Sequence, residues 1–501
     1  MVAAQESDQR FSSRLGFLMS ALGIAVGTGN IWRFPRIAAS NGGEEGAGAF
    51  LVAWVIFLFL WSIPLIIAEY IMGRRSRKGT IGAFVSLVGG KFAWMGGFVG
   101  FVSSAITFYY SVVVGWCIYY FIQMFLHPLP AGTEASWALW NDYQSSLFPL
   151  LFHGTAMGVG AFAIWKGVSS IEKVNKVLIP TLLAIVVLSV FRALTLPGAW
   201  NGVTYLFTPQ WSQLSNPRLW LEALTQNAWD TGAGWGLFLT YAIYIRRRYG
   251  VVKNAFITAI GNNTVSLLAA LMVFGTVFSI LGTEGMTNGE ILGVMKESGP
   301  AATGLTFIWM PQLFAKMPLG KPVAILFFLG LSFAGFSSLI SMMELTSRNL
   351  IDLGLKRKTA IGCVVAASYL LGIPSARNLE FFGNQDFVWG IALMISGVFV
   401  AVAVLRHGIT KLREKEVLQN KNDWNLGPWW DKVVSYVVPT LGVALLIWWL
   451  SLAATVYAPD DWYNPFSPYS VMTCFLQWGV VLTVLWWLNS WMAGRIVKQV
   501  D

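Results

Sequence analysis

The chain has 501 residues, of which 56% are hydrophobic and only 12% are charged, and its mean hydropathy is +0.61. A water-soluble protein of this length needs more charged surface than this composition supplies. Apolar runs near or above the roughly 20 residues that cross the hydrocarbon core of a bilayer recur along the chain. We therefore predict an all-α polytopic membrane protein.

The hydrophobic pattern predicts twelve spans within one transmembrane domain, residues 1–501. The first ten residues, MVAAQESDQR, are polar, so we expect no cleavable signal peptide and expect the first span to direct insertion. The predicted spans cover residues 14–39, 47–73, 95–126, 149–166, 176–196, 220–245, 254–281, 318–348, 359–373, 385–406, 432–457 and 468–491.

The basic residues predict how the spans are oriented. The clusters GRRSRK, IRRRYG, LKRK and RHGITKLREKE follow spans 2, 6, 8 and 10, which must share one side of the membrane. Because positive loops stay in the cytoplasm, we expect a multi-pass protein of the cell membrane with both termini cytoplasmic. The net charge of +10 is then explained by topology, and no nucleic-acid partner is expected.

Neither the cysteines nor the histidines indicate a disulfide framework, a metal site or a catalytic site. Cys117, Cys363 and Cys474 all fall within apolar spans and read as small buried hydrophobic residues, not as a disulfide framework or a metal site. An enzyme would need a nucleophile and base or a metal cluster. The three histidines, His127, His153 and His407, lie near span ends and far apart in sequence.

Two spans are interrupted by residues that disfavour a helix. The first contains GIAVGTGNIWRFP at 23–35 and is expected to be broken at 23–30, and the sixth is expected to be broken at QNAWDTGAGWG, 226–236, with Asp230 among glycines. A break in mid-membrane frees backbone polar groups, which is tolerable only where they line an enclosed site. Paired breaks at matching places indicate a transporter built from two inverted halves. We assign these five-helix halves to 14–196 and 220–406, with 432–491 outside the repeat.

The same stretches resemble a known family. RLGFLMSALGIAVGTGNIWRFP, FYYSVVVGW, LWLEALTQNAWDTGAGWG, FAGFSSLIS and NQDFVWG resemble motifs of the neurotransmitter:sodium symporters, at similar spacings over the whole chain. The resemblance implies the LeuT fold, with twelve transmembrane helices, a 5+5 inverted repeat and unwound helices 1 and 6. It also implies sodium-coupled amino-acid transport, no enzyme activity and no organic cofactor.

A substrate pocket near the middle of the membrane follows from the resemblance. Gly27, Thr28 and Gly29 would meet the substrate carboxylate, and the Tyr110 hydroxyl would bind it too. The other positions that align with the pocket are Ile24, Ala25, Ile106, Trp229, Asp230, Gly232, Trp235, Ser338 and Met342. The bulky Trp229 and Trp235 favour a small neutral amino acid. Gly232 on the same span leaves room in the pocket for a larger one, so the size of the substrate stays open.

Two Na⁺ sites also carry over, both made of oxygen ligands. The first would use the Ala25 carbonyl and the side chains of Asn30, Asp230 and Asn262. The second would use the carbonyls of Gly23, Val26 and Ala334 and the hydroxyls of Ser337 and Ser338.

Asp230 is the main departure from the family. Animal members hold chloride beside the first sodium ion, and the positions equivalent to its ligands are Trp54, Gln226, Asp230, Asn262 and Ser266. A carboxylate is a fixed anion, and an acid inside the membrane is a functional candidate by default. We expect Asp230 to take the place of chloride. Pairing with a cationic substrate and proton exchange are two further roles that the residues leave open.

The resemblance implies a gate at each end of the pocket. Arg33 and Asp386 would close the outer vestibule, with Trp229 as an aromatic lid and Tyr110 below it. The predicted inner gate consists of Arg10, Phe11, Tyr244 and Asp352, of which the displaced Arg10 and the phenylalanine in place of tryptophan depart from the family pattern. Glu69 in the second span matches a buried glutamate that braces the unwound region.

These features together predict a sodium-coupled symporter that imports a neutral amino acid by alternating access, without a chloride requirement. A channel would need a continuous polar pore or rings of charge, which the sequence does not contain. An amino-acid-binding sensor of the same fold, or a transporter of a cationic amino acid or amine paired with Asp230, remains the alternative. Beyond its substrate and the lipid bilayer, no obligate partner is expected.

Overall fold

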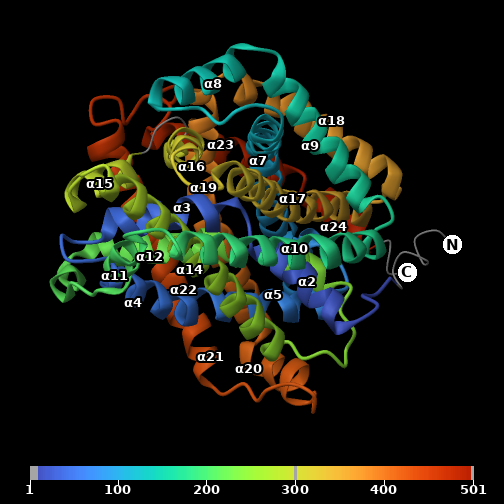
Figure 1. The fold of residues 1–501 in the computed structure, drawn as a ribbon. Coiled ribbons are helices and arrows are strands. Elements are labelled where there is room, and N and C mark those ends of the chain that lie inside the picture. The colour runs from blue at the N-terminus through green and yellow to red at the C-terminus, as the bar shows by residue number, and fades with distance from the viewer. Residues whose placement is uncertain (1–8, 298–301, 498–501) are drawn as a thin grey trace.

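Helices make up the regular structure throughout the part of the chain that the computed structural model describes, residues 9–297 and 302–497, where no strand occurs. Most of the polar N-terminal stretch used above to argue against a signal peptide lies outside these residues. Figure 1 shows the helices packed side by side, with the long helix α10 (Val168–Leu194) running lengthwise across the middle of the view.

The ten spans of the two predicted halves are all present as helices. The first half consists of α2 (Arg14–Ala25) with α3 (Thr28–Asn41), of α4 (Gly48–Phe57), η1 (Leu58–Ser62) and α5 (Ile63–Ser76) in one rod, and of α7 (Ala93–Leu126), α9 (Phe148–Ile164) and α10. The second half consists of α12 (Pro217–Asp230) with α13 (Leu237–Ala242), and of α14 (Val252–Thr283), α17 (Gly320–Asp352), α18 (Arg357–Arg377) and α19 (Leu379–His407).

The remaining helices complete the molecule. The eleventh span joins α21 (Trp429–Lys432), η7 (Val433–Val437), α22 (Val438–Leu452) and η8 (Ala453–Tyr457), and the twelfth joins α23 (Val471–Trp487) and α24 (Asn489–Val497). The connecting elements are α6 (Thr80–Val88), η2 (Gly90–Phe92), α8 (Thr133–Ser145), α11 (Ala199–Phe207), η3 (Trp211–Ser215), α15 (Asn288–Lys296), η5 (Leu305–Trp309), α16 (Met310–Ala315), α20 (Ile409–Leu412) and η6 (Arg413–Leu418).

Length and composition support the predicted spans. Within residues 9–297 and 302–497, eight helices are long and apolar enough to cross a membrane, and the number reaches eleven if each of three bent helix pairs is one span. One of these pairs is α2 with α3, bent by 48°. The sixth predicted span is α12 with α13, which residues 231–236 separate. The inverted relation between the halves stays a prediction.

The start of the fifth span differs from its prediction. Helix α10 begins at Val168, whereas the hydrophobic pattern placed the start near residue 176. The skipped turn is polar, but two of its residues, Glu172 and Asn175, are buried. Hydropathy alone therefore misplaced this boundary, because these polar side chains lie inside the bundle.

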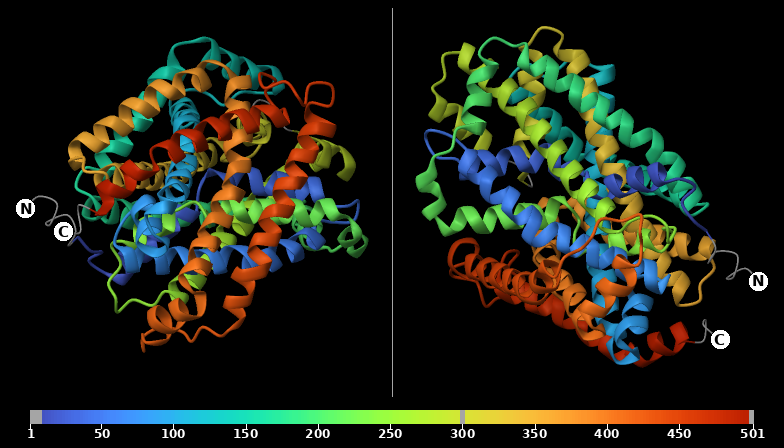
Figure 2. Two further views of the ribbon diagram at one scale, coloured as in Figure 1. Left: turned by 180° about the vertical axis from the view of Figure 1, so that it is seen from behind. Right: turned by 90° about the horizontal axis from the view of Figure 1, so that it is seen from below.

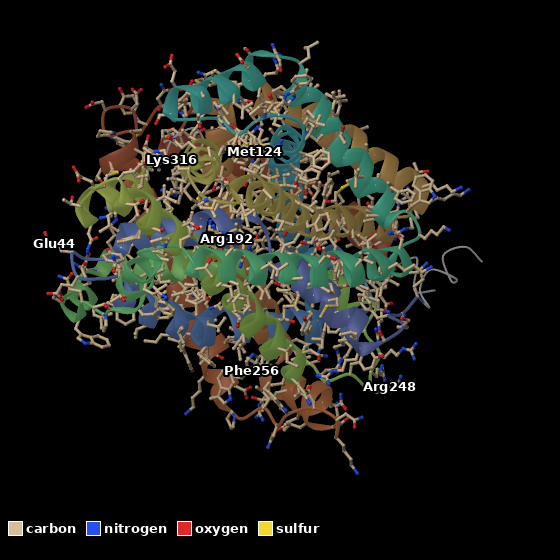
Figure 3. The ribbon with its side chains drawn as sticks, in the orientation of Figure 1. Glu44, Met124, Arg192, Arg248, Phe256 and Lys316 are labelled. Carbon is tan, nitrogen blue, oxygen red and sulfur yellow. The ribbon has the colours of Figure 1, made fainter. Side chains whose placement is uncertain are left out.

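The site lies where the broken spans meet the long helices. Helix α7 packs along α17, α2 and α3 lie beside α17, and α12 lies beside α3 and α4. Helices α22 and α23 lie on the outer surface, as the left view of Figure 2 shows, and only 22% of the apolar window in the eleventh span is buried. Figure 3 shows Glu44 and Arg248 far apart, at the left and lower right of the view. We call the end that carries Arg248 and the other basic loops the basic end.

Candidate substrate and cation sites

The break in the first span is shorter than predicted. Only Val26 and Gly27 leave the helix, both with extended backbones, so Thr28, Gly29 and Asn30 form the first turn of α3. The Asn30 side chain explains the restart, because its Oδ1 accepts a hydrogen bond of 2.8 Å from the Gly27 N–H. An orphan amide at the helix start is satisfied in this way.

The break in the sixth span is confined to residues 231–236. Gly232, Gly234 and Gly236 have φ angles of 68°, 88° and 80°, a region that glycine enters without steric cost. Glu69 on α5 accepts hydrogen bonds from the Gly234 N–H at 2.6 Å and the Leu239 N–H at 3.0 Å. The contacts place Glu69 where the predicted brace needs it. The helix continues through Asp230, contrary to the expected break from 226 onward, because the first left-handed glycine comes only at 232.

A cavity of about 520 Å³ lies between the two breaks. All thirteen residues predicted to contact substrate line it, which are Ile24, Ala25, Gly27, Thr28, Gly29, Ile106, Tyr110, Trp229, Asp230, Gly232, Trp235, Ser338 and Met342. The Tyr110 hydroxyl lies 3.1 Å from Thr28 Oγ1 and accepts a hydrogen bond of 3.3 Å from the Thr28 N–H. Tyr110 is therefore held beside the amide end of α3.

Buried polar side chains from three spans gather on one side of the cavity. Asn30 Nδ2 donates to Asn262 Oδ1 at 2.9 Å and to Ser266 Oγ at 2.7 Å. Gln226 Nε2 donates to Asp230 Oδ2 at 2.6 Å, and Ser266 Oγ donates to the same oxygen at 3.4 Å. These are the side chains predicted for the first Na⁺ site and for the chloride equivalents, and their carbonyl and carboxylate oxygens suit a hard cation.

Trp54 does not join this network. Among the described hydrogen bonds, its carbonyl accepts from Asn227 Nδ2 at 2.6 Å, and its buried indole Nε1 has no partner. Its ring packs against Phe34, with the centroids 4.4 Å apart. The indole therefore fills apolar space at the position where the family places a chloride-binding hydroxyl.

The predicted second Na⁺ site lies between α2 and α17. Ser337 Oγ donates to the Val26 carbonyl at 3.1 Å and to the Ala334 carbonyl at 2.8 Å. Ser338 Oγ lies 3.5 Å from the Ile24 carbonyl, and Gly23 packs against Ser337. All five predicted positions thus meet, and because every available ligand atom is oxygen, the set fits a sodium ion.

The outer end of the cavity holds an arginine over a tryptophan. The Arg33 guanidinium carbon lies 5.0 Å from the Trp229 ring centroid, and Trp229 meets Trp235 edge to face at 5.6 Å. Arg33 and Asp386 both line the cavity, but no ion pair joins them within the described ranges. The two sides of the predicted outer gate are thus present without the pairing that would close it.

Several residues that line the cavity were not among those predicted from the sequence. Its outer part is lined by Arg36, Tyr109, Phe382, Trp449, Tyr457 and Tyr469. Trp449 and Tyr457 belong to the eleventh span, which lies outside the predicted repeat. The sequence carries no sign that this span reaches the cavity, because its pattern is that of an ordinary lipid-facing helix.

The predicted inner gate is built partly from other residues. Phe11 packs against Tyr244 at 6.4 Å between ring centroids, and the Phe11 N–H donates to the Tyr244 carbonyl at 3.1 Å. The ion pair described for Asp352 is with Arg348, at 2.9 Å, and the hydrogen bond described for Arg10 goes to the Gln9 carbonyl. The described contacts thus join Phe11 to Tyr244 and Asp352 to Arg348, and the predicted set of four stays a prediction.

A second ion pair holds Tyr244. Its hydroxyl donates to Glu344 Oε1 at 2.7 Å, and the same carboxylate pairs with Arg357. Glu344 is fully buried on α17. The charges within the stretch MMELTSRNLID were a usable signal for this cluster, since charges inside a span call for partners.

Paired broken helices around a buried oxygen-rich site define a helical secondary transporter. Residues 8–147 and 144–499 match the Sodium:neurotransmitter symporter family. The chain is 33% identical to a sodium-dependent transporter of Methanocaldococcus jannaschii, over 87% of this chain and 89% of that one. It is 27% identical to the sodium- and chloride-dependent taurine transporter of Rattus norvegicus, over 95% of this chain and 82% of that one.

A solved structure agrees with these sequence matches. The crystal structure of MhsT in complex with L-phenylalanine superposes with a TM-score of 0.74 at 27% identity, covering 88% of this chain and 99% of that one. The chain belongs to the Sodium:neurotransmitter symporter family. It is a multi-pass, sodium-dependent membrane transporter with the LeuT fold, and its relatives are transporters, not enzymes.

Proposed function

We propose that this transporter couples the inward movement of a neutral amino acid to sodium at two sites. The cavity between the breaks carries the proposal, because it is lined by the amide end of α3, by Tyr110 and by apolar walls such as Ile24 and Met342. Backbone amides at a helix start suit a carboxylate. The rest of the cavity suits an uncharged side chain, and L-phenylalanine in MhsT is a ligand of this class.

Sodium and substrate would be coupled through shared residues. Asn30 caps Gly27 and also belongs to the first cation site, so a cation there organises the backbone that meets the substrate carboxylate. Coupling of this kind is reciprocal, because each ligand raises the affinity of the other. Closure beyond Arg33 and opening at the basic end would then move the substrate to the cytoplasm, where we place both termini of this cell-membrane protein.

Asp230 would make chloride unnecessary. Its carboxylate is only 6% exposed, and Gln226 and Ser266, two residues at chloride-ligand positions, already donate to Oδ2. The fixed charge therefore lies where a bound anion would otherwise be needed to balance sodium.

A cationic substrate is the second candidate, favoured by the presence of Asp230 in the lining of the cavity. The two hydrogen bonds to Oδ2 argue against it, because they commit one carboxylate oxygen to the protein. A sensor would bind the amino acid without transporting it, and a transport assay distinguishes it from a symporter.

The deciding experiment uses purified protein in liposomes with an imposed sodium gradient and a panel of labelled amino acids. We expect accumulation of neutral amino acids that disappears when sodium is replaced by choline and persists when chloride is replaced by gluconate. Accumulation of only cationic substrates would replace the proposal with its rival. Binding without accumulation would identify a sensor.

A further inference from the structure

Asn175 on α10 is a buried side chain that nothing in the site above uses. It is fully buried, and among the described residues no hydrogen bond of good geometry reaches Oδ1 or Nδ2, although the side chain interacts with the Tyr241 hydroxyl, which is itself 2.9 Å from Ser341 Oγ. A buried amide without well-formed hydrogen bonds is costly and is rare in folded proteins. Such a group calls for an explanation, and a role in binding a cation is one.

Its position supplies that explanation. A methyl group added to Gly23 would lie 3.3 Å from Asn175 Oδ1 and 3.3 Å from Ser337 Cβ. Gly23 and Ser337 are two of the five residues of the proposed second cation site. The amide oxygen of Asn175 therefore lies beside that site, on a third helix in addition to α2 and α17.

Asn175 does not lie at the protein surface, where water could satisfy its amide. Leu22, Leu178 and Ile179 form a buried apolar cluster between α2 and α10. Toward the basic end, Glu172 accepts hydrogen bonds from the Ser12 N–H at 2.7 Å and from the Ser12 hydroxyl. Asn175 thus lies fully buried on α10, one turn from the Glu172 contacts.

A second buried polar group lies on the facing helix. Ser20 is fully buried, and its hydroxyl has no partner in the described ranges. It lies on α2 between Gly16, which packs against Glu172, and Gly23, which packs against Asn175. Positions 16, 20 and 23 share one face of a helix. The seam between α2 and α10 therefore carries two buried polar side chains, Ser20 and Asn175, next to the proposed second cation site.

We propose that Asn175 supplies a further oxygen ligand to the second sodium site, from α10, on the side of the site that faces the basic end. This inference rests on the proposed function, because it requires a cation between Gly23 and Ser337. An amide oxygen is a ligand of the same hard class as the carbonyls and hydroxyls already assigned. With this ligand, sodium at the second site links α10 to α2 and α17 directly.

The test measures sodium binding without transport. Purified protein in detergent is titrated with sodium at constant ionic strength, and ²²Na⁺ binding and the melting temperature are followed. We expect Asn175→Ala to weaken sodium binding about tenfold, the loss that removal of one well-placed partner causes at metal sites. Asn175→Asp keeps an oxygen ligand and should bind sodium at least as well as the wild type. Ser189→Ala is the control, because Ser189 is also a buried polar residue on α10 but far from Gly23.

Comparison of two variants shows whether only the Asn175 ligand or the whole second sodium site is wrong. If Ser337→Ala weakens sodium binding but Asn175→Ala does not, the Asn175 ligand is wrong and the second site stands. If neither variant changes sodium binding, the second site is wrong as well. If Asn175→Ala shifts the melting temperature by the same amount at every sodium concentration, the role is purely structural and the inference is overturned. Asn175→Asp decides the matter if the alanine variant does not fold.

Discussion

The carboxylate of Asp230 lies against the backbone of Gly29, so close that a methyl group added to the glycine would come within 3.2 Å of Asp230 Oδ1. The two residues belong to different broken spans, and this contact joins the break at 26–27 to the one at 231–236. Asp230, one of two acids among the described residues that line the cavity, is thus held between the two broken spans.

Gly29→Ala tests this contact. A new methyl group at 3.2 Å forces either Asp230 or α3 to shift, so we expect a higher sodium concentration for half-maximal uptake, by about three- to tenfold, or roughly 0.7–1.4 kcal/mol. Uptake measured against sodium concentration in liposomes checks this. Gly362→Ala is the matched control, because an added methyl group there meets nothing within 4 Å. Unchanged sodium dependence in Gly29→Ala would show that the contact has no role in cation binding.

Asp230→Ser should convert the transporter to chloride dependence. The substitution removes the fixed anion and leaves Gln226 and Ser266 free to donate to a chloride ion. We expect uptake by the variant to fall at least tenfold when gluconate replaces chloride, and wild-type uptake to be unaffected. Equal uptake by the variant in both anions would argue that Asp230 serves the substrate or a proton instead.

Arg33 should retain bound substrate through Trp229. A cation over an aromatic face contributes about 0.5–2 kcal/mol, so Arg33→Ala should speed substrate dissociation roughly two- to thirtyfold. The release rate of labelled amino acid from sodium-loaded protein is the measurement. Arg248→Ala removes a similar contact with Tyr249 at the basic end, 5.5 Å from the ring centroid, and should leave release unchanged. Equal effects of both substitutions would contradict an outer gate at Arg33.

Glu344→Gln should open the basic end. The buried Glu344 carboxylate pairs with Arg357 and accepts from Tyr244, and loss of one partner from a buried ion pair costs about 3–5 kcal/mol. Because the substitution destabilises the closed conformation, we expect it to favour conformations in which α2 has moved away from α17. A cysteine at Ser20, in a Cys363→Ala background, should then react with a membrane-impermeant thiol reagent at least tenfold faster.

The control for the Glu344 experiment is Lys316→Met, which removes an exposed pair with Glu284 at 2.6 Å. Exposed pairs contribute little, so this variant should label like its parent. No acceleration in Glu344→Gln would show that the Tyr244 cluster does not hold this end closed.

The family motifs predicted which residues line the cavity better than the hydrophobic pattern predicted where the helices begin and end. The predicted lining residues all line one cavity, and each lies within a family motif or directly beside one. The helix ends were less predictable: α10 starts at Val168 because Glu172 finds partners in Ser12 and Lys176, which hydropathy cannot detect. At the predicted inner gate, Asp352 pairs with Arg348, one turn away on the same helix, a partner that the family motifs did not indicate.

The sequence by itself determined that this is a membrane protein with two broken spans, because lipid leaves a chain few ways to satisfy its backbone and glycines mark where the helix ends. The particular partners of each buried polar group were decided only by the tertiary structure. Arg33 lies over Trp229, Tyr244 donates to Glu344, and Asn175 packs against Gly23, because packing brings together residues that are about 100 to 200 positions apart along the chain. No local pattern in the sequence encodes such contacts, since they depend on how whole helices cross.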